Sequence, residues 1–382
     1  MRLEELRKEI DAIDDVLVRA FADRMDLVAQ IGQAKKQLGK PVLDAGRERA
    51  KLAEIAAKLP PALEQYGYPL WSMLFELSRS YQRALDPAPT ALRREIEQAI
   101  ETTPRLFPPS ATVACQGAEG AYAQMACEKV FKHPRIMYFG SFDSVFTAVE
   151  QGFCRYGVLP LENSTAGSVT QIYDLMMRHQ FKIVRATRLK TDHNLLARRG
   201  TRLEDVQEIY SHPQAISQSS AFLEPLRARG VKVIPCENTA VAAERVAGSD
   251  RRDVAAICSH NCVELYGLER LAADIQDQGN NHTRFITISK DLEIYPGADK
   301  TSLMLVAPHR PGALYQILAR FYTLGLNVIK LESRPIPARD FEFMFYFDLE
   351  TSVYSDEFIR MIDDLDSVCD EFQYLGSYSE VI

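Results

Sequence analysis

The N-terminal part of the chain carries the apolar spacing of helices. From residue 3 to about residue 85, apolar side chains recur every three or four positions, and no Pro or Gly occurs before Gly32. The first predicted helix is therefore about 35 residues long, or roughly 50 Å. Two shorter helices follow over Asp44–Leu59, with Asp44 as N-cap, and over Leu70–Leu85. They cannot cover the apolar stripe of the long helix, so we expect a second copy of the chain to do so, in a homodimer or higher homo-oligomer.

From Thr112 to about Lys290, β-rich segments alternate with helical ones. Proline-rich boundaries precede this region at 86–90 and 102–110, with one short linking helix over 91–101. The alternation predicts an α/β fold with a mainly parallel sheet, either as one domain or as two lobes around a cleft. The expected strands are Thr112–Cys115, Ile136–Phe139, Tyr156–Leu161, Lys182–Leu189, Val231–Pro235, Val254–Cys258 and Arg284–Ser289.

The C-terminal part has a third order of elements. Strands are expected over Thr301–Ala307, Ile329–Pro335, Phe341–Leu349 and Glu371–Tyr378, and helices over Gly312–Leu324 and Asp356–Leu365. This βαββαβ order is typical of the α+β ferredoxin-like unit. The chain is therefore predicted to be multidomain, with an all-α domain over 1–88, a linker over 89–110, an α/β domain over 111–292 and a ferredoxin-like domain over 299–382.

Composition and charge narrow the functional classes. Of 382 residues, 46% are hydrophobic and 25% charged, and the net charge of −7 comes without any Lys/Arg block, so we expect no nucleic-acid partner. No apolar run reaches the roughly 18 residues of a membrane span, and the N-terminus is charged, so no membrane or targeting segment is expected. Seven cysteines without a CxxC pair indicate a cytoplasmic protein with reduced thiols. No nucleotide-binding glycine motif occurs, and Cys258, His260 and Cys262 lack a second pair of ligands, so we expect no cofactor and no metal.

Two cations lie among the apolar residues of the first helix. At about 100° per residue, Lys35 falls roughly 20° from Arg24, and a buried cation costs several kcal/mol unless it meets an anion. Arg7 lies about 100° away on the flank of this helix, Arg47 and Glu48 open the second helix, and Ser78 and Gln82 share one face of the third. Each cation alone is explained by a solvated amphipathic helix. Together these residues predict a pocket for a small dicarboxylate.

The segments LRKEID, DRMDLVAQIGQAK, PVLDAGRER and ELSRSYQ resemble the all-helical chorismate mutases. In that family two chains intertwine, and each active site takes one arginine from the partner. The resemblance implies that chorismate is bound by Arg7 of one chain together with Arg24, Lys35, Asp44, Arg47, Glu48, Ser78 and Gln82 of the other. The implied rearrangement to prephenate needs a substrate folded into a chair, with a cation and a donor at the developing ether oxyanion. Lys35, Gln82 and Glu48 are the implied catalytic groups, and the arginines bind the carboxylates.

Four polar motifs fall where strands of the middle region end, which is where ligands bind in βα folds. They are PLENSTAGSV (Pro160–Val169), YSHPQAISQ (Tyr210–Gln218), CENTA (Cys236–Ala240) and TRF (Thr283–Phe285). Each alone is an ordinary polar loop or strand start. Their order and spacing resemble the prephenate dehydratases, a family with two lobes and the active cleft between them.

This second resemblance implies loss of hydroxide and CO2 from prephenate to give phenylpyruvate. Aromatisation drives the reaction, so a weak acid at the leaving hydroxyl suffices, and Thr283 is the implied catalytic residue. The implied prephenate-binding residues are Glu162, Asn163, Ser211, Gln218, Glu237 and Arg284. The first glycine-rich loop departs from the family's GPxGTFS pattern, because it reads Gly117-Ala-Glu-Gly-Ala-Tyr-Ala123, so only the geometry of Gly117 and Gly120 is carried over.

The C-terminal unit resembles ACT regulatory domains, through Gly312-Ala-Leu314 after its first strand and an ESRP motif at Glu332–Pro335. The resemblance implies that L-phenylalanine binds as an allosteric inhibitor at Gly312, Ala313, Leu314, Glu332, Ser333, Arg334 and Pro335. Gly312 admits the ligand backbone to a helix N-terminus. Truncation before about Thr301 is expected to leave a catalytic enzyme that is insensitive to phenylalanine. A purely structural ferredoxin-like module is the alternative.

The three parts together resemble one family, the bifunctional chorismate mutase–prephenate dehydratases. The implied partners are chorismate and prephenate as substrates and L-phenylalanine as effector. One alternative is a non-enzymatic phenylalanine sensor with decayed catalytic halves, against which the retained mutase cations and the TRF motif argue. The other is a dehydratase that uses its N-terminal helices only to dimerise.

Overall fold

The computed structural model describes residues 3–85, 89–307, 309, 311–337, 339, 342–365, 369 and 371–382. The chain divides into two compact units. The helical unit comprises Met1–Glu95, Ala307–Leu326 and Tyr354–Glu371, and the sheet unit comprises Ile96–Val306, Asn327–Val353 and Phe372–Ile382. Helix α4 (Ala91–Thr102) begins in the first unit and ends in the second. The predicted boundary at 86–90 lies partly outside the described residues.

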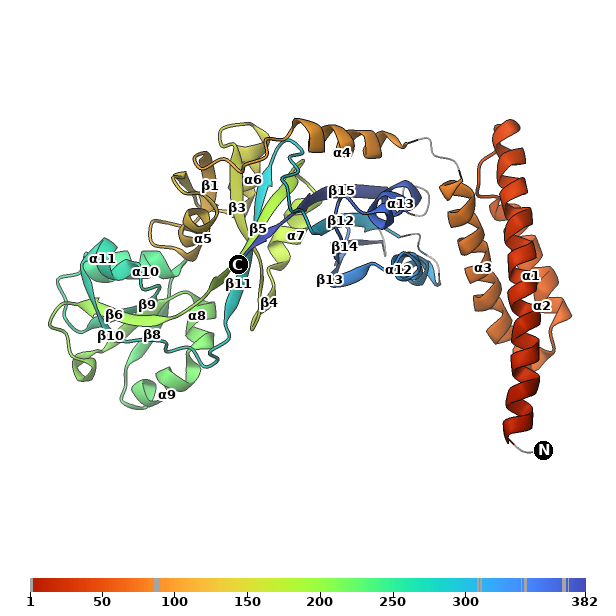
Figure 1. The fold of residues 1–382 in the computed structure, drawn as a ribbon. Coiled ribbons are helices and arrows are strands. Elements are labelled where there is room, and N and C mark those ends of the chain that lie inside the picture. Colours follow the sequence, from red (N-terminus) through yellow and green to blue (C-terminus); the bar gives the residue numbers. More distant parts are fainter. Residues whose placement is uncertain are drawn as a thin grey trace. The chain divides into compact units, whose positions relative to one another are not determined.

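Three N-terminal helices form the larger part of the helical unit, and Figure 1 draws them in red and orange: α1 (Leu3–Gln37), α2 (Ala45–Lys58) and α3 (Glu64–Ala84). Helix α1 is continuous for 35 residues, with two glutamates in its first turn and two lysines in its last, an order that the helix dipole favours. Helix α2 begins where the Asp44 carboxylate accepts a hydrogen bond from the backbone N of Arg47 at 3.0 Å. The predicted long helix and its successor with the Asp44 cap are confirmed.

Helix α3 begins six residues before the predicted start at Leu70. The prediction placed the start after Pro69 because proline has no backbone N–H and disfavours a helix interior. In the structure a 3-10 turn (Pro61–Leu63) leads into the helix, and Pro69 lies within it. Gln65, whose carbonyl loses its partner to Pro69, is exposed, so water can satisfy that oxygen.

The apolar stripe of α1 is largely uncovered in a single chain. Among the described residues of α1, only Val28 is buried, whereas Leu17 and Leu27 are each 59% exposed. None of the helices in the described stretches of the chain is long and apolar enough to cross a bilayer. Two helices from the C-terminal part, α12 (Ala313–Thr323) and α13 (Asp356–Leu365), complete the helical unit, and both contact residues of α3.

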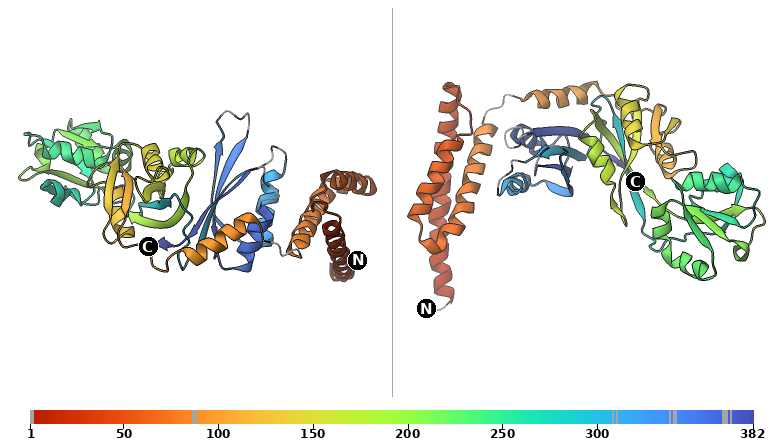
Figure 2. Two further views of the ribbon diagram at one scale, coloured as in Figure 1. Left: turned by 90° about the horizontal axis from the view of Figure 1, so that it is seen from above. Right: turned by 180° about the vertical axis from the view of Figure 1, so that it is seen from behind.

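Two sheets form separate lobes in the middle of the sheet unit (Figures 1 and 2). The seven-stranded sheet has the order β16-β5-β11-β3-β1-β2, with β4 paired to β3, and the five-stranded sheet has the order β10-β6-β9-β7-β8. The strands of the first are β1 (Thr112–Gln116), β2 (Arg135–Phe139), β3 (Tyr156–Asn163), β4 (Gly167–Ser168), β5 (Lys182–Lys190), β11 (His282–Ser289) and β16 (Glu380–Val381). Those of the second are β6 (Asn194–Arg198), β7 (Glu208–Ser211), β8 (Lys232–Pro235), β9 (Val254–Cys258) and β10 (Leu268–Ala272).

Helices cover both sheets and give each lobe its own core. In the first lobe they are α5 (Tyr122–Val130), α6 (Phe142–Glu150) and α7 (Thr170–Met176). In the second they are η2 (Leu203–Asp205), α8 (Pro213–Gln218), α9 (Ser220–Ala228), α10 (Thr239–Ala247) and α11 (Cys262–Tyr266). The chain passes from the first lobe to the second after β5 and returns after β10. The two-lobed alternative of the sequence analysis is therefore the observed one.

The prediction of a mainly parallel sheet is wrong, because both sheets are mixed. In the first, β1 is parallel to β2 and β3, but β11 runs antiparallel to both β3 and β5. In the second, β6 is antiparallel to β9 and β10. The antiparallel pairs arise where the chain crosses between lobes, because a strand that returns from the other lobe enters from the opposite edge and needs no crossover helix.

The C-terminal part follows the predicted order of elements: β12 (Lys300–Val306), α12, β13 (Asn327–Pro335), β14 (Phe343–Glu350), α13 and β15 (Glu371–Tyr378). Its strands form a four-stranded sheet of order β13-β14-β12-β15. Met304, Tyr346 and Tyr378 from this sheet are buried in one hydrophobic core with the seven-stranded sheet. At Gly376 a Cβ would lie 2.2 Å from the carbonyl oxygen of Ile183, so only glycine permits this approach of β15 to β5.

Candidate active sites

The first candidate site lies between α1 and α3. The Arg24 guanidinium donates to the Ser78 hydroxyl at 2.6 Å and to the Leu74 carbonyl at 3.3 Å, so the two helices are joined at a charged group. Burial lowers the pKa of Arg24 from its usual value. A half-buried guanidinium that is held by neutral acceptors keeps its full charge available for an anionic ligand.

Helix α2 and the turn before it supply the next predicted residues. The Lys35 ammonium donates to the Val42 carbonyl at 2.5 Å, and Asp44 is engaged as the N-cap of α2. Arg47 is exposed, whereas Glu48 is half-buried and forms an ion pair with Arg79 of α3. The structure therefore places Lys35, Asp44 and Glu48 around the beginning of one helix, as expected for a shared pocket.

Gln82 of α3 packs against Gly32 of α1, at a point where the two helices lie close together. A Cβ at Gly32 would lie 3.0 Å from Cγ of Gln82, so a larger residue would push the helices apart. The Gln82 side chain is buried, and within the described parts of the chain its Oε1 atom has no hydrogen-bond partner. A buried carbonyl oxygen without a donor is costly, which makes Gln82 a candidate contact for a ligand.

Arg7 cannot share a pocket with Arg24 in the same chain. The two residues are 17 positions apart on one uninterrupted helix, which is about 26 Å along its axis. The Arg7 side chain is 62% exposed and pairs with Glu4 at 2.9 Å. If Arg7 acts on the same ligand as Arg24, it must do so from a second chain.

The second candidate site lies between the two lobes of the sheet unit. Thr283 at the start of β11 accepts a hydrogen bond from the Asn163 amide at 3.0 Å and contacts the Thr191 hydroxyl at 3.0 Å. Asn163 is at the end of β3, directly opposite Thr283 in the strand register. The second lobe contributes Gln218, whose amide donates to the Asn163 Oδ1 atom at 3.2 Å.

The hydrogen bonds of this cluster have one consistent direction. Gln218 donates through Nε2 to Asn163 and Thr165, and its Oε1 atom accepts from Asn281 at 3.2 Å and contacts His193 Nε2 at 2.9 Å. Burial lowers the pKa of His193, which favours the neutral ring, and a neutral ring that donates through Nε2 leaves Nδ1 to accept. Because Asn163 donates to Thr283, the Thr283 hydroxyl proton is left to point elsewhere.

Two predicted prephenate-binding residues, Glu162 and Arg284, lie on the opposite face of the sheet from Thr283. Successive strand residues alternate sides, so each faces away from its neighbour Asn163 or Thr283. Arg284 is buried and pairs with Asp348 of β14 at 2.5 Å, and Glu162 accepts from Lys330 of β13 at 2.8 Å. The structure therefore does not bring these two side chains to Thr283 but joins them to the C-terminal sheet.

Two further predicted residues, Ser211 and Glu237, lie in the second lobe. Ser211, at the end of β7, is fully buried and donates to the Ile257 carbonyl at 2.7 Å. Glu237 follows β8 and is exposed. Of the predicted dehydratase residues, the structure thus joins Asn163 and Gln218 to Thr283 by hydrogen bonds.

Sequence reasoning missed Thr191, His193 and Asn281, which surround Thr283 and Gln218. Thr191 and His193 lie in the KTDHN stretch between β5 and β6, where the chain crosses between lobes. A run of polar residues between two apolar strands was the signal that identifies them, because a crossing between lobes passes the cleft. Asn281 immediately precedes the TRF motif and is 2% exposed.

The atypical glycine loop closes one end of this region. Gly117 and Gly120 have φ of 114° and 91°, in the region that favours glycine, so the geometry carried over for both is confirmed. The Ser259 hydroxyl of the second lobe donates to the Gly120 carbonyl at 2.8 Å. A Cβ at Gly120 would lie 3.0 Å from Cys262 Sγ, so glycine permits the two lobes to meet here.

The residues predicted to bind phenylalanine fall in both units. Gly312, with φ 82°, is the N-cap of α12 in the helical unit, and Ala313 and Leu314 follow it. In the sheet unit, Glu332 accepts from the Ser168 hydroxyl at 2.6 Å and Arg334 pairs with Asp174 at 2.8 Å, while Ser333 and Pro335 are exposed. Pro308 and Arg310 of the predicted effector loop lie outside the described residues.

A helical module with clustered cations and a two-lobed α/β module with a polar cleft define an enzyme with two catalytic parts, and comparison with known proteins agrees. Residues 113–293 match the prephenate dehydratase family, and residues 6–83 match chorismate mutase type II. The chain is 31% identical over 381 residues to the bifunctional chorismate mutase/prephenate dehydratase of Escherichia coli, covering 98% of this chain and 95% of that protein. It therefore belongs to the family of bifunctional chorismate mutase/prephenate dehydratases. Both activities follow, the rearrangement of chorismate to prephenate and the conversion of prephenate to phenylpyruvate.

Two further relatives cover the dehydratase region. Arogenate dehydratase/prephenate dehydratase 2, chloroplastic, of Arabidopsis thaliana is 36% identical over 278 residues, which is 70% of this chain and 72% of that protein. The structure of a prephenate dehydratase in complex with L-Phe from Arthrobacter aurescens is similar with a TM-score of 0.64 and 28% identity, over 70% of this chain and 90% of that one.

Proposed function

We propose that Lys35, Gln82 and Glu48 carry the mutase reaction and that Arg24, Arg47 and a partner's Arg7 bind the two carboxylates of chorismate. The rearrangement needs no base and no nucleophile, so catalysis rests on holding the chair conformer and on meeting charge that develops at the ether oxygen. Lys35 supplies the cation and the Gln82 amide the donor. Asp44 fixes the start of α2, and Ser78 orients Arg24.

The proposed site is completed by dimerisation. The exposed apolar stripe of α1 is the surface that a second α1 would bury, at roughly 25 cal/mol per Å². The 26 Å spacing of Arg7 and Arg24 along α1 suits an arrangement in which each arginine serves a different site. We therefore assign the N-terminal 88 residues to a mutase domain that works as a homodimer.

For the dehydratase, we assign Thr283 as the acid that protonates the leaving hydroxyl of prephenate. The single observation that carries this assignment is the directed chain of hydrogen bonds from His193 through Gln218 and Asn163, because it makes Thr283 an acceptor from Asn163. The Thr283 proton can then be donated to the substrate when Thr191 acts as the donor in its own contact with Thr283. Loss of water and CO2 then gives the aromatic ring of phenylpyruvate, which supplies the driving force. Asn163 and Gln218 both bind and orient, and Ser211 and Glu237 line the second lobe's side.

The experiment that tests these roles uses purified protein and chorismate, with separate detection of prephenate and phenylpyruvate. Thr283→Ala should accumulate prephenate, and Lys35→Ala should leave chorismate unconverted but still process added prephenate. Arogenate, named in the Arabidopsis relative, serves as a competing substrate for the cleft. If Thr283→Ala makes phenylpyruvate at the wild-type rate, the acid lies elsewhere.

We further assign residues 299–382 to an ACT-type ferredoxin-like domain through which L-phenylalanine inhibits the dehydratase. The complex of the Arthrobacter relative with L-Phe supports this effector. So do the contacts of Glu332 and Arg334 with Ser168 and Asp174, because they tie the ESRP strand to the lobe that holds Thr283. Titration calorimetry with L-phenylalanine, alongside dehydratase assays, tests it: binding without inhibition would contradict the regulatory role.

A further inference from the structure

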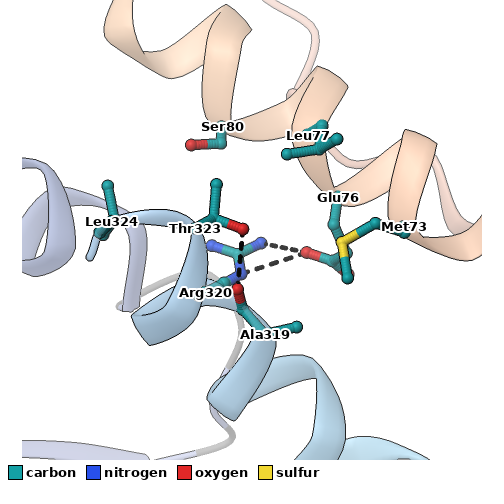
Figure 3. Close-up of a pocket in the computed structure, with 8 residues that line it drawn as sticks. All are labelled: Met73, Glu76, Leu77, Ser80, Ala319, Arg320, Thr323 and Leu324. Carbon is teal, nitrogen blue, oxygen red and sulfur yellow. Dashed lines mark hydrogen bonds and ion pairs between the residues drawn. The ribbon is translucent and has the colours of Figure 1, made fainter. Parts of the chain in front are cut away.

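Four charged side chains of alternating sign connect α2, α3 and α12 within the helical unit. Glu48 of α2 accepts from Arg79 of α3 through both carboxylate oxygens, and the other guanidinium nitrogen of Arg79 donates to Glu76. Glu76 in turn accepts from Arg320 of α12 at 2.7 and 3.1 Å, as Figure 3 shows. The family's mutase motifs, as matched above, assign no role to Arg79, Glu76 or Arg320.

The burial of this chain of charges makes its members depend on one another. The side chains of Glu76, Arg79 and Arg320 are 8%, 10% and 6% exposed. Two carboxylates and two guanidinium groups balance in charge, and removal of Arg79 takes away the ion pair of Glu48 and one of the two ion pairs of the buried Glu76. Figure 3 shows Leu77 and Leu324 among the residues that line a small pocket together with Arg320 and Glu76.

Arg79 neutralises the Glu48 carboxylate beside the proposed mutase site. Glu48 stands in the first turn of α2, next in sequence to Arg47, one of the cations proposed to bind a substrate carboxylate. A free carboxylate there would pair with those cations and compete with chorismate. One terminal nitrogen of Arg79 contacts both carboxylate oxygens of Glu48, and the other terminal nitrogen is held by Glu76. Because the guanidinium is planar and rigid, this arrangement holds the Glu48 carboxylate in one orientation.

We propose that Arg79 is a positioning residue of the mutase site, which holds Glu48 away from the substrate-binding cations, and that Glu76 and Arg320 fix Arg79 from helix α12. This inference rests on the proposed role of Glu48. It makes mutase turnover depend on a residue of the C-terminal part that touches neither substrate.

The test compares Arg79→Met and Arg79→Lys in the full-length protein, with kcat and KM measured for chorismate. Arg79→Met should lower kcat roughly 10- to 100-fold, the size expected when a catalytic group is displaced by about an ångström, with KM altered less than about threefold. Arg79→Lys should restore part of kcat, because an ammonium still pairs with Glu48. Dehydratase turnover should stay at the wild-type rate. A kcat within twofold of wild type in a folded Arg79→Met variant overturns the proposal.

Separate variants test the contact of Arg320 in α12 with Glu76. Arg320→Met should lower mutase kcat in the same direction but less than Arg79→Met, and the two together should cost less than the product of the single effects, because they act through one chain of contacts. Independent multiplication of the two effects would show that α12 plays no part. The matched control is Glu54→Gln, which removes exposed ion pairs with Lys51 and Lys58 on α2 and should leave kcat unchanged.

The variant Glu48→Gln distinguishes the positioning role of Arg79 from the proposed catalytic role of Glu48, on which it rests. If Glu48→Gln is inactive while Arg79→Met is active, only the positioning role fails. If Glu48→Gln is itself fully active, the catalytic role assigned to Glu48 is wrong. The positioning role of Arg79 is then wrong as well, because it depends on Glu48. Should Arg79→Met not fold, Arg320→Met and Glu76→Gln carry the test, since neither touches Glu48.

Discussion

The two candidate sites differ in how far their residues contact one another within a single chain. In the dehydratase cleft, Thr283, Asn163 and Gln218 already satisfy one another by hydrogen bonds within a single sheet unit. In the mutase helices, the Gln82 Oε1 atom has no partner among the described residues, and Arg7 lies far from Arg24 along one rigid helix. Two lobes can enclose a ligand by folding alone, whereas three helices have little surface with which to do so, and the shared site proposed above would supply the rest.

The sharpest way to break this comparison is to remove one activity and keep the other. Lys35→Ala should lower mutase kcat by up to about 10³, because one preorganised donor at a developing oxyanion contributes about 10²–10³, while added prephenate is still consumed normally. Coupled assays from chorismate and from prephenate measure the two rates. Lys36→Ala, at the neighbouring exposed position, is the control, and loss of both activities in Lys35→Ala would mean that the two parts are not independent.

Thr283→Ala gives the converse result. Dehydratase kcat should fall by about 10² or more, the lower range for loss of a positioned acid, with the mutase unaffected. Thr283→Ser should keep much of the rate because it retains the hydroxyl that Asn163 orients. Accumulation of prephenate from chorismate provides the measurement. Equal rates in the alanine and serine variants would remove the hydroxyl from the mechanism.

Sensitivity to L-phenylalanine should be lost in Gly312→Val. The effector is expected to change dehydratase activity roughly 5- to 150-fold, the range of common allosteric couplings. A side chain at this left-handed position strains the N-terminus of α12 and fills the open space beside Gly312 that the ligand backbone is proposed to use. Gly230→Val carries the same backbone strain in the second lobe and should remain sensitive. Equal loss in both variants would indicate general destabilisation.

A smaller effect is expected at Thr191, which contacts Thr283 but not the substrate in our proposal. Thr191→Val preserves the shape and removes one hydrogen bond, worth about 1 kcal/mol, so dehydratase kcat should fall about fivefold. Steady-state kinetics with prephenate measure it. A loss as large as that of Thr283→Ala would make Thr191 the proton donor instead.

Mixed dimers test whether the mutase site is shared. After subunit exchange, Arg7→Ala and Lys35→Ala chains should recover about a quarter of wild-type mutase activity, because half the dimers are mixed and each has one intact site. Mixing Arg24→Ala with Lys35→Ala should recover nothing, since both residues serve the same site. Confirmed exchange without any recovery in the first mixture rules out the shared site.

Apolar periodicity was sufficient for the helices and for most strands, because each element carries its own pattern. It failed at Pro69, where α3 runs through a residue that usually ends helices, and at β16, whose two residues are too few to show a period. Apolar periodicity also does not predict strand direction, because β11 has the same local pattern whether it pairs in parallel or antiparallel.

For the candidate sites, the motifs predicted which strand ends form the site better than they predicted which side chains face it. Glu162 and Asn163 stand in one motif, and Thr283 and Arg284 in another, yet each pair splits across the sheet. The two-residue period of strands predicts that split, so it was available from the sequence once the strands were placed. Contacts such as Arg284 with Asp348 were not available, because they join residues 64 positions apart.

A truncation before Thr301 would remove contacts within the sheet unit. Arg284 would lose Asp348 and remain buried without its partner, a change that typically costs 3–5 kcal/mol. Met304, Tyr346 and Tyr378 would also leave the core that they share with the seven-stranded sheet. Point variants such as Gly312→Val are therefore the cleaner route to an enzyme that no longer responds to phenylalanine.

Strand β16 has a consequence for the order in which the protein acquires its structure. Its Val381 carbonyl accepts a hydrogen bond from the Thr187 hydroxyl of β5, a separation of 194 residues. Closing so long a loop costs entropy that only a preformed β5 can offset, so the edge of this sheet should be the last part to assemble. During synthesis, this edge of β5 therefore stays unpaired until the second lobe and the C-terminal strands have emerged from the ribosome.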